Sequence, residues 1–453
     1  MNIEEETNGD IIVVGGGAAG LMAAGRAGEL GAGVLLLEKT DSCGKKILVS
    51  GKTRCNLTNS ADLKNFISMY GDNGRFLFSA FHNFFRPELL AFLDNLGLAT
   101  KVERGGRIFP VSDDAHDVVR VLKKYLSQNN VRVKLNTKVT GIIIKNNVAY
   151  GVRTPGGEYF SKAVILATGG STWPSTGSTG DGYKISAALG HNIVKLKPAL
   201  VPLIVHEQKL AQSMQGVSLR NVRVTAFQGK AASINSTLTT DCVYGRGEKK
   251  SPRHPVIESR FGEMLFTHFG LGGPIILLMS LSVVEALEKG PVSLLIDLKP
   301  ALTPEQLHKR LQRDMDKSSK RKISGIMKEY LPAKMIEPFI ELTGIDKEKL
   351  AHQITALERG KIVEILKALR FNIKSPLALE KAIVTAGGVS LAEIDQRTMA
   401  SKLIAGLYFC GEVMDIDADT GGYNLQAAFS TGYIAGEKSA EYVKSFPCSS
   451  LVL

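Results

Sequence analysis

The chain has few cysteines and no long apolar run, and each shortage argues against a class of protein. Only five of its 453 residues are cysteine, and none lies in a C-x-x-C pair or at the spacing of a metal site. We therefore expect neither a disulfide-bonded scaffold nor a bound metal. No apolar segment reaches the roughly 20 residues that a bilayer-spanning helix needs, so we expect no membrane partner. The polar, acidic N-terminus is unlike a secretory signal and favours a cytoplasmic location.

Several catalytic signatures are also missing from the sequence. There is no G-x-S-x-G turn and no Walker A loop, which argues against hydrolases and kinases. Cys43 and Cys55 flank a Gly-rich segment and admit a redox-active pair, but their spacing is longer than the short spacing of flavin disulfide reductases. Small packed thiols are therefore the favoured interpretation.

Acidic residues are fewer than basic ones, so that 56 Lys and Arg against 44 Asp and Glu give a net charge of +12. Such a charge is compatible with nucleic acid or with acidic substrates. The basic residues are dispersed, with clusters at Lys317–Lys322 and Arg246–Arg253, and neither cluster carries the interleaved aromatics of a single-strand binding surface. Solvated loops are the simpler explanation, and a nucleic-acid partner stays the weaker alternative.

The most informative segment is the opening β-α-β pattern. An apolar strand, Ile11–Val14, leads into G-x-G-x-x-G, a helical pattern follows, and a second apolar strand, Val34–Leu37, ends at Glu38. A carboxylate at this place accepts hydrogen bonds from a ribose hydroxyl. Strand, glycines, helix and acid in this order predict a dinucleotide-binding site.

Each glycine of the motif has a separate physical reason. Gly15 allows the tight turn after the strand, Gly17 lets the backbone approach a pyrophosphate, and Gly20 lets the helix pack closely on the strand. The helix N-terminus presents free N–H groups and the positive end of its dipole to the phosphates.

A second polar segment, SGKTRCNLTN, follows the second strand. Its cation, hydroxyls and amides suit a ligand that has both phosphates and ring heteroatoms. We expect Arg54 to clamp a phosphate, and Asn56, Thr58 and Asn59 to hydrogen-bond a ring edge. The alternative is an ordered loop with no ligand.

Two later strands end in Gly-rich turns of the kind that a dinucleotide requires. Ala163–Ala167 runs into Thr168-Gly169-Gly170, and the strand at Leu407–Cys410 runs into Gly411 and a further Gly-rich turn before the last helix. The N-terminus of that helix favours negative charge. Three alternating aspartates precede it without an EF-hand pattern, so a metal is not expected there.

Two aromatic side chains are further candidates. Trp173, the only tryptophan, either lines a substrate pocket or packs in the core. His268 is a weak candidate for proton transfer, although a lone histidine is more often structural.

Changes in the residue pattern along the chain, from α/β to β-rich to helical, predict the domain organisation. Residues 1–196 and 380–453 are expected to form one discontinuous α/β nucleotide-binding domain, because the strand and turn near residue 407 supply what such a sheet needs. Residues 197–300 are β-rich and barrel-like. Residues 301–379 are expected to form a helical subdomain, which begins with a Thr303 N-cap, Pro304 and a capping box completed by Gln306.

The chain resembles a bacterial family of predicted NAD(P)/FAD-dependent oxidoreductases, sometimes labelled after aminoacetone oxidase or a bile-acid dehydroxylation flavoprotein. The resemblance rests on VVGGGAAGLMAA, SGKTRCNLTN, LATGGSTWPSTGSTGDGY, GEMLFTHFGLGGP, VTAGGVSLAEI and GLYFCGEVMDIDADTGGYNLQAAFSTGYIAG, which together span almost the whole chain. It implies FAD on a glutathione-reductase-like, Rossmann-type fold with an inserted β module and a helical subdomain. The sequence departs from the family pattern at Lys52 or Thr53, at GLGGP and at Arg253-His254-Pro255. These differences bear on the fine substrate contacts and not on FAD.

The resemblance also implies roles for individual residues. The motif glycines would hold the pyrophosphate, Glu38 the adenosine ribose, the Val139 backbone the adenine, and the segments after residues 50 and 411 the flavin end. The cofactor residues implied in this way are Gly15, Gly17, Ala18, Ala19, Gly20, Glu38, Lys39, Lys45, Ser50, Gly51, Arg54, Cys55, Asn56, Val139, Thr168, Gly169, Gly170, Gly411, Glu412, Gly422, Asn424, Leu425 and Gln426.

These observations predict an FAD enzyme that moves a hydride between flavin N5 and a small organic substrate or NAD(P)H. No second complete G-x-G-x-x-G occurs, so NADH or NADPH would bind only transiently. Two alternatives remain, an FAD protein that acts on or binds nucleic acid, and a non-catalytic flavin redox sensor. Oxidase or reductase, substrate, catalytic base and oligomeric state are left open.

Overall fold

The computed structural model describes residues 9–231 and 255–445. The chain divides into two compact units, residues 1–197 with 383–453 and residues 198–382. Cys242, Cys448, the Arg246–Arg253 cluster and His254 lie outside the described residues. Among the described residues, none of the helices has both the length and the apolar character that crossing a membrane would require.

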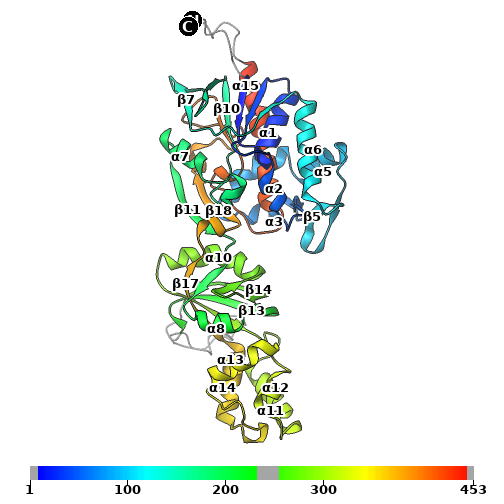
Figure 1. Ribbon diagram of the computed structural model, residues 1–453, viewed down its shortest axis with the longest axis vertical. Coiled ribbons are helices and arrows are strands. Elements are labelled where there is room, and N and C mark those ends of the chain that lie inside the picture. The colour runs from blue at the N-terminus through cyan, green and yellow to red at the C-terminus, as the bar shows by residue number, and fades with distance from the viewer. Residues whose placement is uncertain (1–8, 232–254, 446–453) are drawn as a thin grey trace. The chain divides into compact units, whose positions relative to one another are not determined.

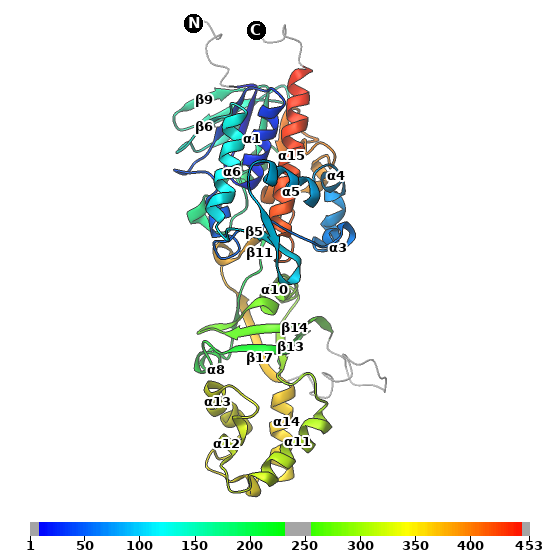
Figure 2. The same cartoon turned by 90° about the vertical axis from the view of Figure 1, so that its right-hand side faces the viewer.

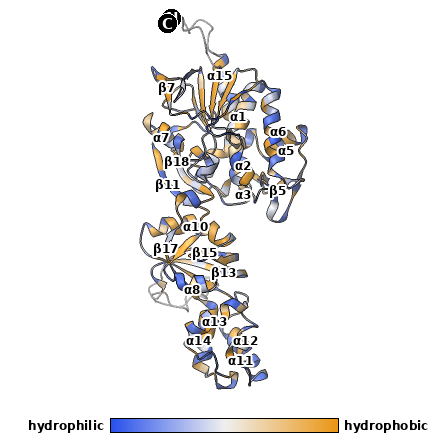
Figure 3. Cartoon of the chain, viewed as in Figure 1, coloured by the Kyte–Doolittle hydropathy of each residue, from blue (hydrophilic) through white to orange (hydrophobic). Residues whose placement is uncertain are grey.

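A five-stranded parallel sheet forms the centre of the first unit (Figure 1). Its order is β19-β10-β1-β2-β6, with every neighbouring pair parallel. The strands are β1 (Ile11–Val14), β2 (Val34–Leu37), β6 (Arg132–Lys134), β10 (Ala163–Leu166) and β19 (Leu407–Phe409). All except β6 are short, fully buried apolar runs, as expected of a parallel sheet covered on both faces. Figure 3 shows strands of this sheet in the hydrophobic colour.

Two helices that are far apart in sequence pack against each other beside this sheet. Helix α1 (Ala18–Glu29) and helix α15 (Tyr423–Lys444) lie side by side in both Figure 1 and Figure 2. A Cβ added at Gly432 or Gly436 of α15 would lie 2.4 Å from the Ala19 carbonyl oxygen or 2.3 Å from that of Ala23. The close approach of the two backbones therefore requires glycine at both positions.

The rest of the first unit consists of shorter elements around this core. A hairpin sheet contains β7 (Gly141–Lys145), β8 (Val148–Thr154) and β9 (Gly157–Phe160); a second small sheet contains β3 (Thr58–Asn59), β5 (Arg107–Pro110) and β4 (Thr100–Val102); and β11 (Ile193–Ala199) pairs with β18 (Val384–Val389). The helices are α2 (Lys45–Val49), α3 (Leu63–Ser68), α4 (Phe78–Asn83), α5 (Arg86–Asn95), α6 (Ala115–Gln128) and α7 (Asp181–Ala188), together with the 3₁₀ turns η1 (Gly71–Leu77), η3 (Pro174–Thr176), η7 (Leu391–Glu393) and η8 (Gly411–Val413).

The second unit is built on a closed six-stranded barrel, which confirms the β-barrel-like module. The strand order is β12-β15-β14-β13-β16-β17. The strands are β12 (Leu203–Val205), β13 (Ser218–Gln228), β14 (Val256–Phe266), β15 (Gly270–Gly272), β16 (Val292–Asp297) and β17 (Leu369–Pro376), accompanied by helices α8 (Gln208–Ser213) and α10 (Pro274–Leu287). Strand β12 begins only at Leu203, because Leu200 adopts a left-handed conformation with φ of 55° and Pro202 follows.

Four helices gather in one group within this unit (Figure 2). They are α11 (Pro304–Lys317), α12 (Ile323–Met327), α13 (Ala333–Thr343) and α14 (Ala356–Lys367). The Thr303 side chain accepts a hydrogen bond from the Gln306 N–H, as the capping box predicted. The expected helical subdomain at 301–379 is wrong at its end, because 369–376 is strand β17, which pairs with β12 and β16 in the barrel.

Candidate functional site

The turn between β1 and α1 has the shape that a pyrophosphate needs. Gly15 has φ of 105°, and a Cβ added at Gly20 would lie only 1.9 Å from the Gly15 carbonyl oxygen. A Cβ added at Gly17, the N-cap of α1, would meet nothing within 4 Å. The two outer glycines are therefore required by the fold, and the middle one faces open space at the positive end of a helix.

Glu38 is held in place at the end of β2. One carboxylate oxygen accepts a 2.7 Å hydrogen bond from the Gly16 N–H, and the other accepts a 2.8 Å bond from the Thr40 N–H. The residue is 8% exposed. A carboxylate has about four acceptor positions, so lone pairs remain for a ribose hydroxyl. Val139 is buried as well.

The lysines predicted to approach the cofactor already have partners. Lys39 contacts Asp181 at 2.6 Å and Thr179 at 2.5 Å, and Lys45 contacts Asp41 at 2.6 Å. Their charges are therefore not available as isolated cations for a phosphate. Lys39 instead joins the end of β2 to the start of α7.

The segment after α2 carries a run of unusual backbone conformations. Lys52, Thr53 and Cys55 have φ of 57°, 67° and 60°. Non-glycine residues rarely adopt this region, and such strain gathers at functional sites. The segment leads to Asn56 and Thr58, each of which has a buried side-chain oxygen without a hydrogen-bond partner among the described residues.

Arg54 has a different role from the predicted phosphate clamp. Its guanidinium donates to both oxygens of Glu103 at 2.9 and 3.1 Å and to Asp113 at 3.1 Å, and it lies 4.1 Å from the centre of the Phe109 ring. A guanidinium with two carboxylate partners and a ring contact holds the loops together. The residue type alone did not reveal these partners, because both acids are distant in sequence.

The cysteines do not form a redox pair. Cys43 and Cys55 are free and buried. Burial raises the pKa of the Cys43 thiol to about 11, assisted by Glu38, and burial raises the pKa of the Cys55 thiol to about 12. Both thiols are therefore protonated at neutral pH and pack as small apolar groups, as the simpler interpretation predicted.

Several of the predicted residues present buried polar atoms that have no partner in the described part of the chain. Besides Asn56 and Thr58, these are the Thr168 hydroxyl and the side-chain oxygen of Gln426. Buried polar groups are nearly always hydrogen-bonded, so orphaned atoms at strand ends and at a helix start point to a missing polar ligand. Together with the open cradle at Gly17, they fit FAD.

A buried hydrogen-bond network adds residues that the sequence did not single out. Lys46 contacts Glu412 at 2.6 Å and the Thr172 hydroxyl at 2.8 Å. The other Glu412 oxygen accepts a 2.9 Å bond from the Thr385 N–H. Glu412 was predicted and the other three were missed, although Thr172 lies in the STWP motif and Lys46 is adjacent to the predicted Lys45.

The hydrogen-bond network around Glu412 leaves no room for a side chain at position 170. A Cβ at Gly170 would lie 2.4 Å from the Thr385 hydroxyl and 2.8 Å from Glu412. Gly169 and Gly411 have φ of 69° and 73°. The two strand-end turns therefore meet closely, as their predicted position at one edge of the sheet required.

Helix α15 begins at the Gly-rich turn that follows residue 420, with Gly422 as its N-cap at φ of 98°. Its first-turn N–H groups have no partners within the helix. The Asn424 side chain is tied to the loop before the helix, because it accepts from the Ala418 N–H at 3.0 Å and donates to the Ala418 carbonyl at 2.8 Å. Gln426 donates to Ser430 at 3.0 Å, which leaves its oxygen without a partner.

The remaining candidates are exposed or lie elsewhere. Trp173 is 42% exposed and precedes the turn η3, so it is not a core residue. His268 is exposed in the turn between β14 and β15 of the second unit, where its ring contacts Phe269. No group of three metal-binding side chains occurs within the described ranges, Asp415 and its neighbours included.

A parallel sheet with a glycine cradle, a buried carboxylate at the end of the second strand and orphaned polar atoms defines an FAD-binding oxidoreductase of the Rossmann type. The particular family follows from comparison with known proteins: residues 9–438 match the family described as HI0933-like protein Rossmann domain, and the chain belongs to it. This confirms the predicted fold class and the predicted FAD-dependent oxidoreductase family.

Relatives extend over nearly the full length of the chain. The 3-dehydro-bile acid delta(4,6)-reductase of Clostridium scindens is 30% identical over 95% of this chain and 98% of that enzyme. The ribosomal RNA dihydrouridine synthases of Haemophilus influenzae and Escherichia coli are each 28% identical, over 93% and 94% of this chain and 96% and 97% of those enzymes.

Proposed function

We propose that the protein is a reductase that adds hydrogen across a carbon–carbon double bond conjugated to a carbonyl group. The observation that carries the proposal is the near full-length similarity to the bile acid delta(4,6)-reductase. The dihydrouridine synthases support the same chemistry, because dihydrouridine is uridine with its conjugated ring double bond saturated. One reaction type therefore accounts for both kinds of relative.

The chain's residues divide the work of binding and polarisation. When bound, FAD supplies a two-electron carrier that accepts and donates hydride. Gly15, Gly17 and Gly20 would hold the pyrophosphate, and Glu38 the adenosine ribose. The N–H groups at the start of α15 would stabilise negative charge at the flavin end.

Three polar side chains and one ion pair would keep the flavin end of the site polar and ordered. Thr168, Asn56 and Gln426 each offer an oxygen that has no partner among the described residues. Lys46 and Glu412 form an ion pair in which both side chains are mostly buried, which fixes a positive and a negative group in place. A preorganised polar site of this kind costs no reorganisation when charge develops.

The electron donor in this proposal is NADH or NADPH. The sequence offers no second dinucleotide motif, which supports transient binding rather than a separate nicotinamide domain. Two electrons and one proton come from the donor as hydride, and a second proton comes from solvent or a side chain. The double bond of the acceptor is lost and two C–H bonds form.

The test is anaerobic spectroscopy of the purified, FAD-loaded protein. NADH or NADPH should bleach the flavin absorbance, and a 3-oxo steroid with conjugated double bonds should restore it with formation of the saturated product. Flavin that never bleaches would contradict the donor and favour the redox sensor. Flavin that is reduced but reoxidised only by oxygen would contradict the reductase and favour an oxidase.

RNA is the second candidate acceptor. The net charge of +12 and the two dihydrouridine synthase relatives favour it. Reduced protein would then convert uridine in ribosomal RNA to dihydrouridine, detected by mass spectrometry. Binding should weaken steeply with salt, because Lys and Arg contacts to phosphate release counterions. RNA that stays unmodified, and binding that is insensitive to salt, would remove this candidate.

A further inference from the structure

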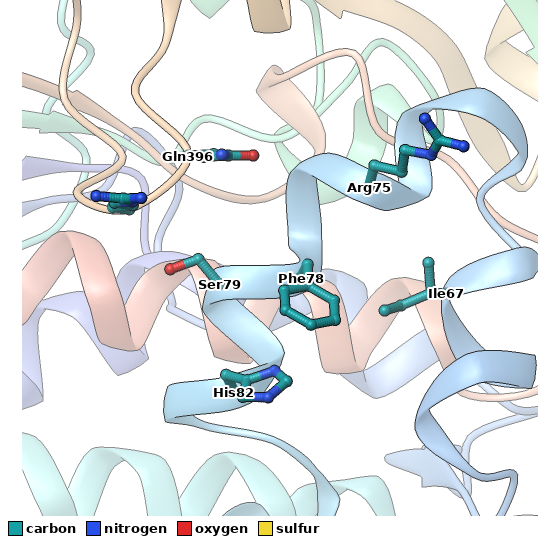
Figure 4. Close-up of a pocket in the computed structure, with 7 residues that line it drawn as sticks. Ile67, Arg75, Phe78, Ser79, His82 and Gln396 are labelled. Carbon is teal, nitrogen blue, oxygen red and sulfur yellow. The ribbon is translucent and has the colours of Figure 1, made fainter.

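A pocket in the first unit shares no lining residue with the cofactor site. Its volume is about 450 Å³, within the range of roughly 300–1,000 Å³ typical of small-molecule sites. Two segments line it: the stretch from α3 to α4, and the turn that follows η7 (Figure 4). Neither segment was singled out by the sequence motifs.

An exposed aromatic pair forms one wall of the pocket. Phe78 begins α4 and is 53% exposed, so this large apolar side chain is open to a ligand. The His82 ring lies 4.4 Å from the Phe78 ring at an angle of 35°. Figure 4 shows the two rings adjacent on the same helix. The His82 ring packs against the Phe78 ring, and the exposed part of Phe78 offers a surface on which a planar ring can stack.

Cations surround this surface. Arg75 and Arg397 both line the pocket, are exposed, and have no ion pair among the described residues. In Figure 4, Arg75 and Gln396 lie on opposite sides of Phe78, and Arg397 follows Gln396 in the chain. Unpaired guanidinium groups next to an exposed aromatic ring match the chemistry of a phosphate joined to a planar base.

Hydrogen-bonding groups complete the pocket. Gln396 has an amide donor and acceptor, and Ser79 a hydroxyl, suited to the polar edge of a base. The turn that carries Gln396 and Arg397 is fixed by Asp395, whose side chain accepts from the Arg397 N–H at 2.8 Å and the Thr398 N–H at 3.0 Å. The arginine is thus presented from an ordered turn.

We propose that this pocket binds a nucleotide, with the base stacked on Phe78 and the phosphate held by Arg75 or by Arg397. An apolar ligand would leave two cations unpaired, and a simple anion would leave the aromatic surface unused. A nucleotide supplies an anion for the arginines and a planar ring for the aromatic surface. It comes either as a free nucleotide or as one unit of a single-stranded nucleic acid, and the two sources differ in whether a neighbouring unit is needed for binding.

The experiment measures binding to the FAD-loaded protein, so that the cofactor site is filled. The probes are AMP, by calorimetry, and a fluorescein-labelled oligoadenylate, by polarisation, with inorganic phosphate for comparison. Phe78→Leu keeps an apolar side chain but removes the ring, and should weaken base-containing probes about tenfold. At least one of Arg75→Gln and Arg397→Gln should weaken them by a similar factor, and the effect should shrink at high salt.

Arg104→Gln is the matched control, because Arg104 is an exposed arginine of the same unit outside the pocket. Binding of AMP assigns the pocket to free nucleotides, and binding of the oligonucleotide alone assigns it to a strand. No saturable binding of either probe, wild-type affinity in all three pocket variants, or phosphate binding as tight as AMP would overturn the proposal. Unchanged flavin absorbance and circular dichroism verify folding, and Arg397→Gln, in an exposed turn, keeps the test valid if Phe78→Leu does not fold.

Discussion

At the scale of single residues, burial and hydrogen bonding determine what a polar side chain can do. Glu38 and Arg54 were both assigned to the cofactor from their positions in motifs. Glu38 is fixed by two backbone N–H groups and keeps lone pairs for a ligand, whereas the Arg54 guanidinium already pairs with Glu103 and Asp113. The same kind of sequence evidence therefore supports a binding role for one residue and a structural role for the other.

Glu38→Gln should weaken FAD binding about tenfold, which corresponds to roughly 1.4 kcal/mol. The substitution removes the charge that two N–H groups and the ribose share, and its amide cannot accept from both N–H groups. Calorimetric titration of the apoprotein with FAD measures the effect. Glu158→Gln, in an exposed ion pair with Arg153, is the control and should bind FAD as the wild type does. Equal affinity for both variants would contradict the role of Glu38.

His191 gives a prediction for pH. Its buried ring lies 3.1 Å from Glu393 on one side and 3.1 Å from Ser401 on the other. Burial lowers the pKa of His191 below its ordinary value of 6.5, and Glu393 offsets this only in part. The unfolded chain therefore takes up a proton more readily than the folded one. The contribution of the neutral His191 ring to the stability of the fold is complete above pH 6.5. It decreases as the pH falls through the pKa of His191 in the folded protein.

The check is the unfolding midpoint measured from neutral to mildly acidic pH in wild type and His191→Gln. Glutamine does not titrate in this range, so the variant should lose less stability on acidification than the wild type does. It should also be less stable at neutral pH, because the glutamine side chain does not reproduce the contacts of the imidazole ring with Glu393 and Ser401. Identical pH profiles would show that His191 does not carry the effect.

At the scale of elements, the nucleotide-binding half depends on how closely α1 and α15 approach. Residues about 410 positions apart in the chain pack with glycine against backbone carbonyls at Gly432 and Gly436. This contact joins the start of the chain to its end. It also supports the two helix N-termini that would face the cofactor.

The variant Gly436→Ala should destabilise the protein by about 1–3 kcal/mol, because the added Cβ meets the Ala23 carbonyl at 2.3 Å and backbone cannot move aside easily. Gly360→Ala in α14 is the matched control, since a Cβ there meets nothing within 4 Å. Helix propensity should make that variant more stable by about 0.5–1 kcal/mol. Urea unfolding distinguishes the two, and a stabilised Gly436→Ala would contradict the close packing.

At the scale of the whole molecule, each compact unit has its own hydrophobic core. The largest cluster belongs to residues of the first unit, and a second cluster combines the barrel with the helices α11–α14. Units with separate cores commonly unfold separately. The residues predicted to bind FAD all lie in the first unit, so we expect FAD to stabilise that unit.

Thermal unfolding with two probes tests this organisation. Trp173 is the only tryptophan and lies in the first unit, so its fluorescence reports on that unit, whereas far-ultraviolet circular dichroism reports on both. FAD at about 100 times its Kd should stabilise the fluorescence transition by roughly 2.7 kcal/mol. A second dichroism transition should stay in place. A single transition that shifts as a whole with FAD would show that the units unfold together.

The sequence by itself determined the elements whose signals are local. The four glycine-marked turns, the buried parallel strands and the capping box at Thr303 follow from steric freedom, burial on two faces and backbone hydrogen bonding. These depend on neighbours a few residues away. The FAD-binding fold could therefore be predicted from β1, α1, β2 and Glu38.

Only the tertiary structure decided which distant partners each side chain meets. It assigned Arg54 to Glu103 and Asp113, joined Lys46 to Glu412, and placed 369–376 in the barrel rather than in the helical group. It also gathered Arg75, Phe78 and Arg397 around one pocket. No local pattern contains these pairings, because charge pairing, strand closure and cavity lining depend on segments that only folding brings together.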